Sequence, residues 1–106
     1  RVAAVIHHGG AGTTAAGLRA GRPSVIVPSF GDQFFWGGRT AQLGAGPAPI
    51  PRRRLTARKL AGAIQQAVGN QAIATAAAEV GQRIQAEDGI GTAVDLIERF
   101  ARKGHL

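Results

Sequence analysis

Residues 5–14, VIHHGGAGTT, decide the fold of this chain. They close an apolar run that begins at Val2, pass through a glycine-rich turn and open an alanine-rich stretch typical of a helix. A strand that ends in such a turn leaves backbone N–H groups without partners, and the N-terminus of the following helix adds a partial positive charge. The segment therefore predicts an anion site, with phosphate as the favoured ligand.

The flanking sequence extends this turn into a repeating unit. We predict a strand over 2–6, a helix over 13–20 and a second strand over 24–28, with glycine and proline ending the helix. A short helix between two apolar strands is the building block of a doubly wound parallel sheet. The predicted fold class is therefore α/β.

Polar side chains follow the second strand as well as the first. Asp32 and Gln33 come soon after the apolar run 24–28. Ligands of doubly wound sheets bind at the carboxyl ends of the strands. We therefore expect the loops 8–14 and 30–35 to lie on one edge of the sheet and to contact one ligand, a nucleotide sugar.

The rest of the chain is expected to be mainly helical covering. Residues 34–43 predict a helix, whereas the glycine and proline of 44–51 indicate a loop or a short edge strand. Thr56 is a candidate N-cap for a helix that runs to about residue 68. The stretch 71–87 and the residues from 92 to about 104 predict two further helices.

The composition is that of a globular protein rather than a disordered one, with 44% hydrophobic and 18% charged residues in 106. The chain has no cysteine, which excludes disulfides and thiolate metal sites. No apolar stretch approaches the roughly 20 residues that cross a bilayer. Two strands are too few for a stable parallel sheet, and the chain lacks methionine, so we expect a fragment whose other strands lie upstream.

The net charge of +7 suggests an anionic partner, and the densest basic run is Arg52-Arg53-Arg54, with Arg58 and Lys59 nearby. We favour a solvated face, because nucleic-acid modules pair such charge with stacking aromatic residues or a reading helix. No nucleic-acid partner is therefore predicted. Peripheral contact with an anionic membrane stays open, and the cluster could steer an anionic nucleotide to the site.

The spacing of these residues resembles the donor-binding signature of nucleotide-sugar glycosyltransferases of the two-Rossmann-domain (GT-B) architecture. The matching positions are His8-x-Gly10-x-x-Thr13, Gly21-Arg22-Pro23, Pro28 and Asp32-Gln33. Within that superfamily, residues 7–14 and 30–37 are most similar to sterol 3-beta-glucosyltransferases and related bacterial enzymes. The resemblance implies that residues 1–106 are the C-terminal part of the Rossmann-like donor-binding domain, with the N-terminal acceptor domain outside this sequence.

The resemblance also implies roles for the residues of both turns. His8 would donate a ring N–H to a diphosphate oxygen, and Asp32 and Gln33 would hydrogen-bond the sugar hydroxyls. Backbone N–H groups would bind the diphosphate at Gly10, Ala11, Gly12 and Thr13, with the Thr13 hydroxyl in addition. No catalytic residue is expected in this chain, because the base of the family is a histidine of the N-terminal domain.

The implied activity is inverting transfer of glucose from UDP-glucose, or a related nucleotide sugar, to a hydroxyl of a sterol-like or other lipophilic acceptor. The chain has no Asp-x-Asp pair, so no metal or other cofactor is expected. Ala16 stands where many plant relatives carry a ribose-binding glutamate, which leaves the ribose contacts unassigned. The implied location is the cytoplasm. The alternative is a non-catalytic nucleotide-binding module or remnant.

Three structural roles compete with these assignments. His7 is left outside the site as a packing or loop histidine, and it forms no metal pair with His8 because adjacent strand residues point to opposite faces. Asp32 could cap a helix that begins near Phe34. The aromatic side chains of Phe34, Phe35 and Trp36 could contact an acceptor or the partner domain, but we expect them to pack against the sheet.

Overall fold

The computed structural model describes residues 3–87. Their two strands, β1 and β2, pair in parallel, with Val5 opposite Ser24 and His7 opposite Ile26. The elements in chain order are β1 (Val5–His7), α1 (Ala11–Arg19), β2 (Ser24–Ile26), α2 (Asp32–Gln42), a 3-10 turn η1 (Arg52–Arg54), α3 (Ala57–Gly69) and α4 (Gln71–Ala86). The predicted strand–helix–strand unit and the α/β class are confirmed, whereas the helix predicted from residue 92 lies outside the described residues.

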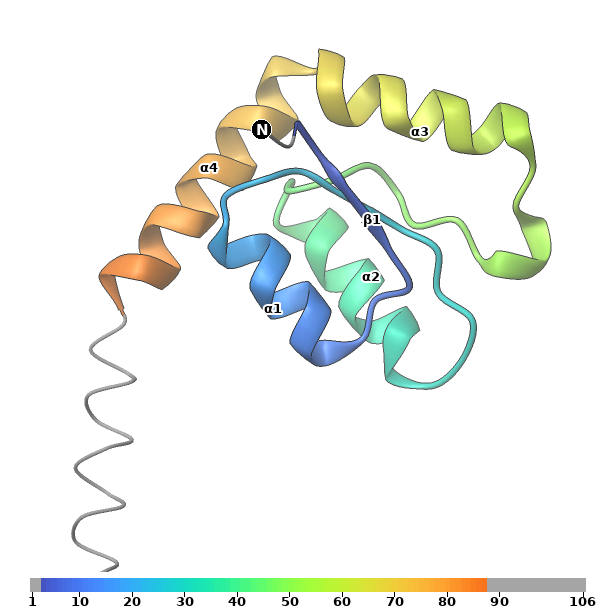
Figure 1. Cartoon of the computed structure of the whole chain (residues 1–106), viewed down its shortest axis with the longest axis horizontal. Helices are drawn as coiled ribbons and strands as arrows, with labels where there is room; N and C mark the ends of the chain where they lie inside the picture. Colours follow the sequence, from blue (N-terminus) through green and yellow to red (C-terminus); the bar gives the residue numbers. More distant parts are fainter. Residues whose placement is uncertain (1–2, 88–106) are drawn as a thin grey trace, which may run out of the picture.

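Helices cover both faces of the strand pair (Figure 1). Val25 packs with Ala63 and Ala67 of α3 on one face. On the other face Gly17 of α1 lies against Val5 and Ser24. Because successive strand residues point to opposite faces, the register places the two helices on opposite sides. This is the doubly wound arrangement.

Residues 44–51, predicted as a loop or short edge strand, run along the free edge of β2. Ser24 donates its N–H to the Ala45 carbonyl at 3.0 Å, and Ile50 donates to the Ile26 carbonyl at 3.0 Å. A Cβ on Gly46 would overlap the Ser24 carbonyl oxygen, so only glycine allows this approach. Residues 44–51 thus cover the outer edge of β2, and among the described residues the unpaired edge of the sheet is that of β1.

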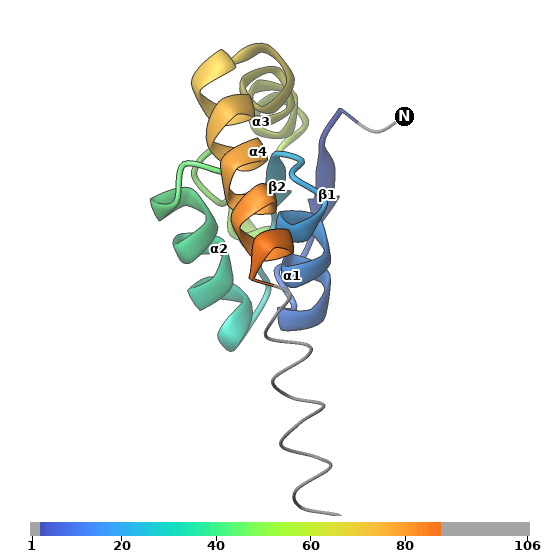
Figure 2. The ribbon, with the colours of Figure 1, turned by 90° about the vertical axis from the view of Figure 1, so that its left-hand side faces the viewer.

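The last described helix, α4, leaves α3 at a corner and runs beside α1 (Figure 2). Both α3 and α4 have side-chain caps: Thr56 accepts the Lys59 N–H, and Asn70 accepts the N–H groups of Ala72 and Ile73. The cap predicted at Thr56 is therefore confirmed. None of the helices in residues 3–87 combines the length and apolarity needed to span a membrane.

The prediction that aromatic residues of α2 are buried is wrong for Phe34 and Phe35, which are 45% and 61% exposed. The buried positions of α2 are Gln33, Gly37 and Thr40. A Cβ on Gly37 would lie 3.3 Å from Ile26 Cγ2, so the helix meets the strand through a small residue. That close approach turns the two phenylalanines outward.

The starts of two helices differ from the predictions by two residues. Helix α1 begins at Ala11 rather than Thr13, and α2 begins at Asp32 rather than near Phe34. In both cases a glycine occupies the N-cap, so the helix starts directly after the turn. The basic cluster of Arg52 to Arg54, Arg58 and Lys59 is fully on the exposed surface, as expected for a solvated face.

Candidate functional site at the carboxyl ends of the strands

The first turn places the His8 ring over Gly10. The Gly10 N–H donates to His8 Nδ1 at 3.2 Å, and a Cβ on Gly10 would lie only 2.7 Å from His8 Cε1. A neutral imidazole whose Nδ1 accepts a hydrogen bond carries its proton on Nε2. The exposed His8 side chain therefore has Nε2–H as the donor for a ligand.

The start of α1 supplies further donors. The first bond of the helix runs from the Thr14 N–H to the Gly10 carbonyl at 2.8 Å, and Gly10 provides no side-chain cap. Within the described part of the chain, the N–H groups of Ala11, Gly12 and Thr13 consequently have no acceptor. The Gly10 N–H is already used by His8, so three consecutive amides, rather than four, face outward.

The second turn is held by Gln33. Its side chain is only 8% exposed, and its Oε1 accepts the N–H groups of Ser29 at 2.8 Å and of Phe30 at 3.4 Å. The amide group of Gln33 is thus the part that remains to donate. This side chain shapes the loop that carries Asp32.

Asp32 is the first residue of α2 and is exposed. The N-cap is Gly31, with a φ of 59°, and it has no side-chain cap bond, so the alternative in which Asp32 caps the helix is wrong. In residues 3–87 nothing bonds the Asp32 carboxylate. A carboxylate at the N-terminus of a helix is stabilised by the helix dipole. The exposed Asp32 side chain is therefore accessible to a ligand.

The two turns meet at Gly9. A Cβ on this residue, whose φ is 92°, would lie 2.8 Å from the Gln33 carbonyl oxygen and 2.9 Å from Ile26 Cγ2. His8 is the residue before Gly9 in the first turn, and Asp32 is the residue before Gln33 in the second. The prediction that both turns lie at one edge of the sheet is confirmed, and the binding roles of their residues remain predictions.

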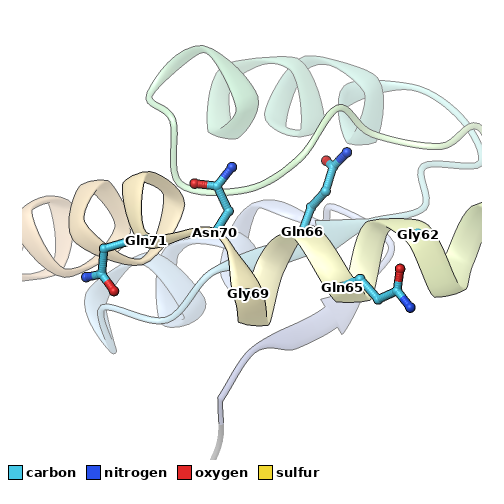
Figure 3. A pocket seen from close by; sticks show the side chains of 6 residues that line it. All are labelled: Gly62, Gln65, Gln66, Gly69, Asn70 and Gln71. Atoms are coloured by element: carbon cyan, nitrogen blue, oxygen red, sulfur yellow. The ribbon is translucent and has the colours of Figure 1, made fainter.

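A separate hollow lies at the corner between α3 and α4 (Figure 3). It has a volume of 650 Å³ and is lined by glycines and by the amide side chains of Gln65, Gln66, Asn70 and Gln71. Asn70 Oδ1 already caps α4. The hollow has no ionisable or nucleophilic group, so it offers no chemistry for group transfer. Residues 3–87 also hold no cluster of three side chains suited to a metal ion.

Comparison with known proteins finds relatives that are themselves sugar transferases. The chain is 48% identical over 96 residues to sterol 3-beta-glucosyltransferase UGT80B1 of Arabidopsis thaliana, covering 91% of this chain and 15% of that protein. It is 44% identical over 101 residues to O-mycaminosyltylonolide 6-deoxyallosyltransferase of Streptomyces fradiae, covering 95% and 24%. This chain therefore spans less than a quarter of the length of either relative.

A solved structure shares the fold. Glycosyltransferase VinC in complex with DTDP superimposes with a TM-score of 0.73 and 29% identity, over 92% of this chain and 25% of VinC. The family model for the erythromycin biosynthesis protein CIII-like C-terminal domain matches residues 1–95. The paired strands, the turns at their carboxyl ends and these matches lead to one conclusion: the chain belongs to the EryCIII-like C-terminal domains of GT-B glycosyltransferases.

Proposed function

We propose that this chain is the donor-binding portion of a longer, UDP-sugar-dependent inverting glycosyltransferase that transfers glucose to a hydroxyl of a sterol-like or other lipophilic acceptor. The observation that carries the proposal is the contact of Gly9 with Gln33, which brings the amide-rich turn and the Asp32 turn together. A diphosphate on the first turn and its sugar on the second are then neighbours. The sterol glucosyltransferase relative supports the choice of sugar and acceptor.

The first turn would bind the leaving group. Transfer breaks the bond between the sugar and the diphosphate, and negative charge grows on the diphosphate oxygens. His8 Nε2–H and the amides of Ala11, Gly12 and Thr13 are in place before the reaction, so little reorganisation is needed to stabilise that charge. We propose that these donors act without a metal ion, because the sequence lacks the carboxylate pair that would hold one beside the turn.

The second turn would orient the sugar. Asp32 would accept hydrogen bonds from sugar hydroxyls, and Gln33 would donate from its amide, since its carbonyl oxygen already holds Ser29 and Phe30. Both groups sit on the first turn of α2, a regular element that restrains them. The acceptor and the general base would come from the rest of the longer protein.

A second donor class has specific support. The Streptomyces relative is a 6-deoxyallosyltransferase, and the VinC structure holds DTDP. Thymidine and uridine nucleotides differ at the 2′ position and at the base. The residue near the expected ribose position is Ala16, which has no polar side chain to distinguish them. A dTDP-deoxysugar is therefore the competing donor.

Calorimetric titration of the full-length protein with UDP and dTDP tests both proposals. Tighter binding of UDP than of dTDP would support the UDP-sugar donor, and the reverse order would support the competing donor. We expect His8→Ala to weaken UDP binding by about tenfold, the value of one charge-assisted hydrogen bond. His8→Gln should recover part of the affinity, because its amide can donate near the position of Nε2. Gln66→Ala, in the hollow between α3 and α4, is the matched control and should bind as the unaltered protein does.

The sugar assignment has its own measurement. Asp32→Asn should lower the affinity for UDP-glucose while leaving that for UDP unchanged, because UDP has no sugar for Asp32 to bind. An unchanged ratio of the two affinities would refute the sugar contact. Equal UDP affinity of the His8→Ala and unaltered proteins would refute the diphosphate site. Transfer of labelled glucose to a sterol then separates an enzyme from a binding module.

A further inference from the structure

His7, the last residue of β1, makes the same local hydrogen bond as His8 but on the inner side of the turn. The Gly9 N–H donates to His7 Nδ1 at 3.0 Å, just as the Gly10 N–H donates to His8 Nδ1. Adjacent strand residues point to opposite faces, so the His7 ring is half-buried while the His8 ring is exposed. The two histidines thus hold successive amides of one turn.

The surroundings of the His7 ring favour its neutral form. Burial is the larger cause that lowers the pKa of His7 below its usual value of 6.5, and the neighbouring His8 adds to it, so the neutral ring is favoured. Because Nδ1 accepts a hydrogen bond, the proton of the neutral ring is on Nε2. Nε2 is buried near Gly17 of α1, where an ideal Cβ would lie 3.9 Å away, and has no acceptor in the described part of the chain.

The amide that His7 holds belongs to the residue where the two turns touch. Gly9 has a φ of 92° and lies against the Gln33 carbonyl. A glycine in this region has many accessible conformations, so a bond to its N–H restricts the turn strongly. His7 therefore acts on the alignment of the two turns without facing the ligand.

We propose that His7 is a positioning residue of the donor site: through Gly9 it holds the diphosphate turn at a fixed place relative to the Asp32 turn. The inference rests on the proposed function for the identity of the ligand, a nucleotide sugar. A ligand that spans both turns depends on their alignment, whereas UDP alone depends mainly on the first turn. Loss of the His7 bond should then affect UDP-glucose more than UDP.

Two substitutions of similar size distinguish this role from simple packing. In His7→Asn, Oδ1 occupies the position of Nδ1 and can accept the N–H two residues ahead, as asparagine commonly does in turns. In His7→Gln, the polar group lies one bond further out, at the position of Nε2, so the Gly9 N–H has no acceptor. The comparison is made in the full-length protein, with thermal unfolding used to confirm that both variants are folded.

We expect His7→Asn to bind UDP-glucose within about threefold of the unaltered protein, and His7→Gln to bind it about tenfold more weakly, with a smaller change for UDP. The Gly9 amide should be protected from hydrogen exchange in the unaltered protein and in His7→Asn but not in His7→Gln. Equal UDP-glucose affinity of the two variants would overturn the role of His7. A fall in UDP affinity as large as that in UDP-glucose affinity would also overturn it.

The outcome for His7 is separable from that for the proposed function. If the unaltered protein binds neither UDP-glucose nor a dTDP-sugar, the proposed function is wrong, and the inference about the ligand falls with it. If the unaltered protein binds the donor and the two variants behave alike, only the inference about His7 is wrong. Nitrogen chemical shifts of the His7 ring give a third measurement, since a proton on Nδ1 would contradict the hydrogen bond to Gly9.

Discussion

Alanine substitution at Gly9 and at Gly12 adds the same methyl group to one turn in two different surroundings. At Gly9 the new Cβ would lie 2.8 Å from the Gln33 carbonyl oxygen and 2.9 Å from Ile26 Cγ2. At Gly12 the new Cβ meets no protein atom within 4 Å. The pair therefore separates the packing of the turns from the binding of a ligand.

The two substitutions should change the free energy of unfolding in opposite directions. A side chain at the left-handed φ of Gly9 costs about 1–2 kcal/mol, and the overlap with buried neighbours costs about 1–3 kcal/mol more. We expect Gly9→Ala to lower the free energy of unfolding by about 2–5 kcal/mol. Gly12→Ala should raise it by up to about 1 kcal/mol, because alanine favours the helix.

Urea unfolding and UDP titration of the full-length protein measure both effects. Gly12→Ala should be folded and yet bind UDP about tenfold more weakly, because its methyl group stands where the α1 amides would meet the phosphate. Equal unfolding free energies of the two variants would show that the turn does not pack on Gln33 as described. Unchanged UDP affinity of Gly12→Ala would remove the start of α1 from the diphosphate site.

Three further predictions concern stability. Gly81→Ala should lower the free energy of unfolding by about 1–3 kcal/mol, because the added Cβ would lie 2.6 Å from Gly21 Cα. Gly62→Ala is the control, because a Cβ there would meet no atom within 4 Å outside its own helix backbone, and it should cause no loss of stability in a thermal melt. Asn70→Ala should cost about 1 kcal/mol in urea unfolding through the lost cap, and an unchanged midpoint would argue against it. Folding lowers the pKa of His7, so the unfolded chain binds more protons than the folded one below pH 6.5. The free energy of unfolding should therefore fall as the pH drops below that value, and it should fall less steeply in His7→Asn.

Much of the site follows from sequence because it depends on local chemistry. The glycines of the first turn predict free amides, and the apolar runs predict two parallel strands whose ends share an edge. The meeting of Gly9 with Gln33 could not be predicted in detail, since it depends on how closely α2 approaches β2. The role of Gln33 as an internal anchor of its own loop was missed for the same reason.

The exposed phenylalanines show where a simple hydrophobic rule fails. Phe34 and Phe35 are large and apolar, which favours burial, but the side of α2 that faces the sheet is chosen by Gly37 and its contact with Ile26. From sequence alone, a glycine in a helix does not show whether the helix lies close to a strand at that position, because the neighbouring strand is not known. The sequence predicts only a packing or loop role for His7, because its hydrogen bond with the Gly9 amide depends on the conformation of the turn.

Where the two turns meet, the backbone of Gly9 lies close to main-chain atoms of Gln33, its carbonyl oxygen and Cα, rather than to a side chain of the second turn. The spacing of the turns is therefore insensitive to which side chain stands at position 32. Under the proposed function, exchanging Asp32 would alter the sugar preference and leave nucleotide binding unchanged. Variation at this position would then be a route to donor engineering that keeps the proposed diphosphate turn unchanged.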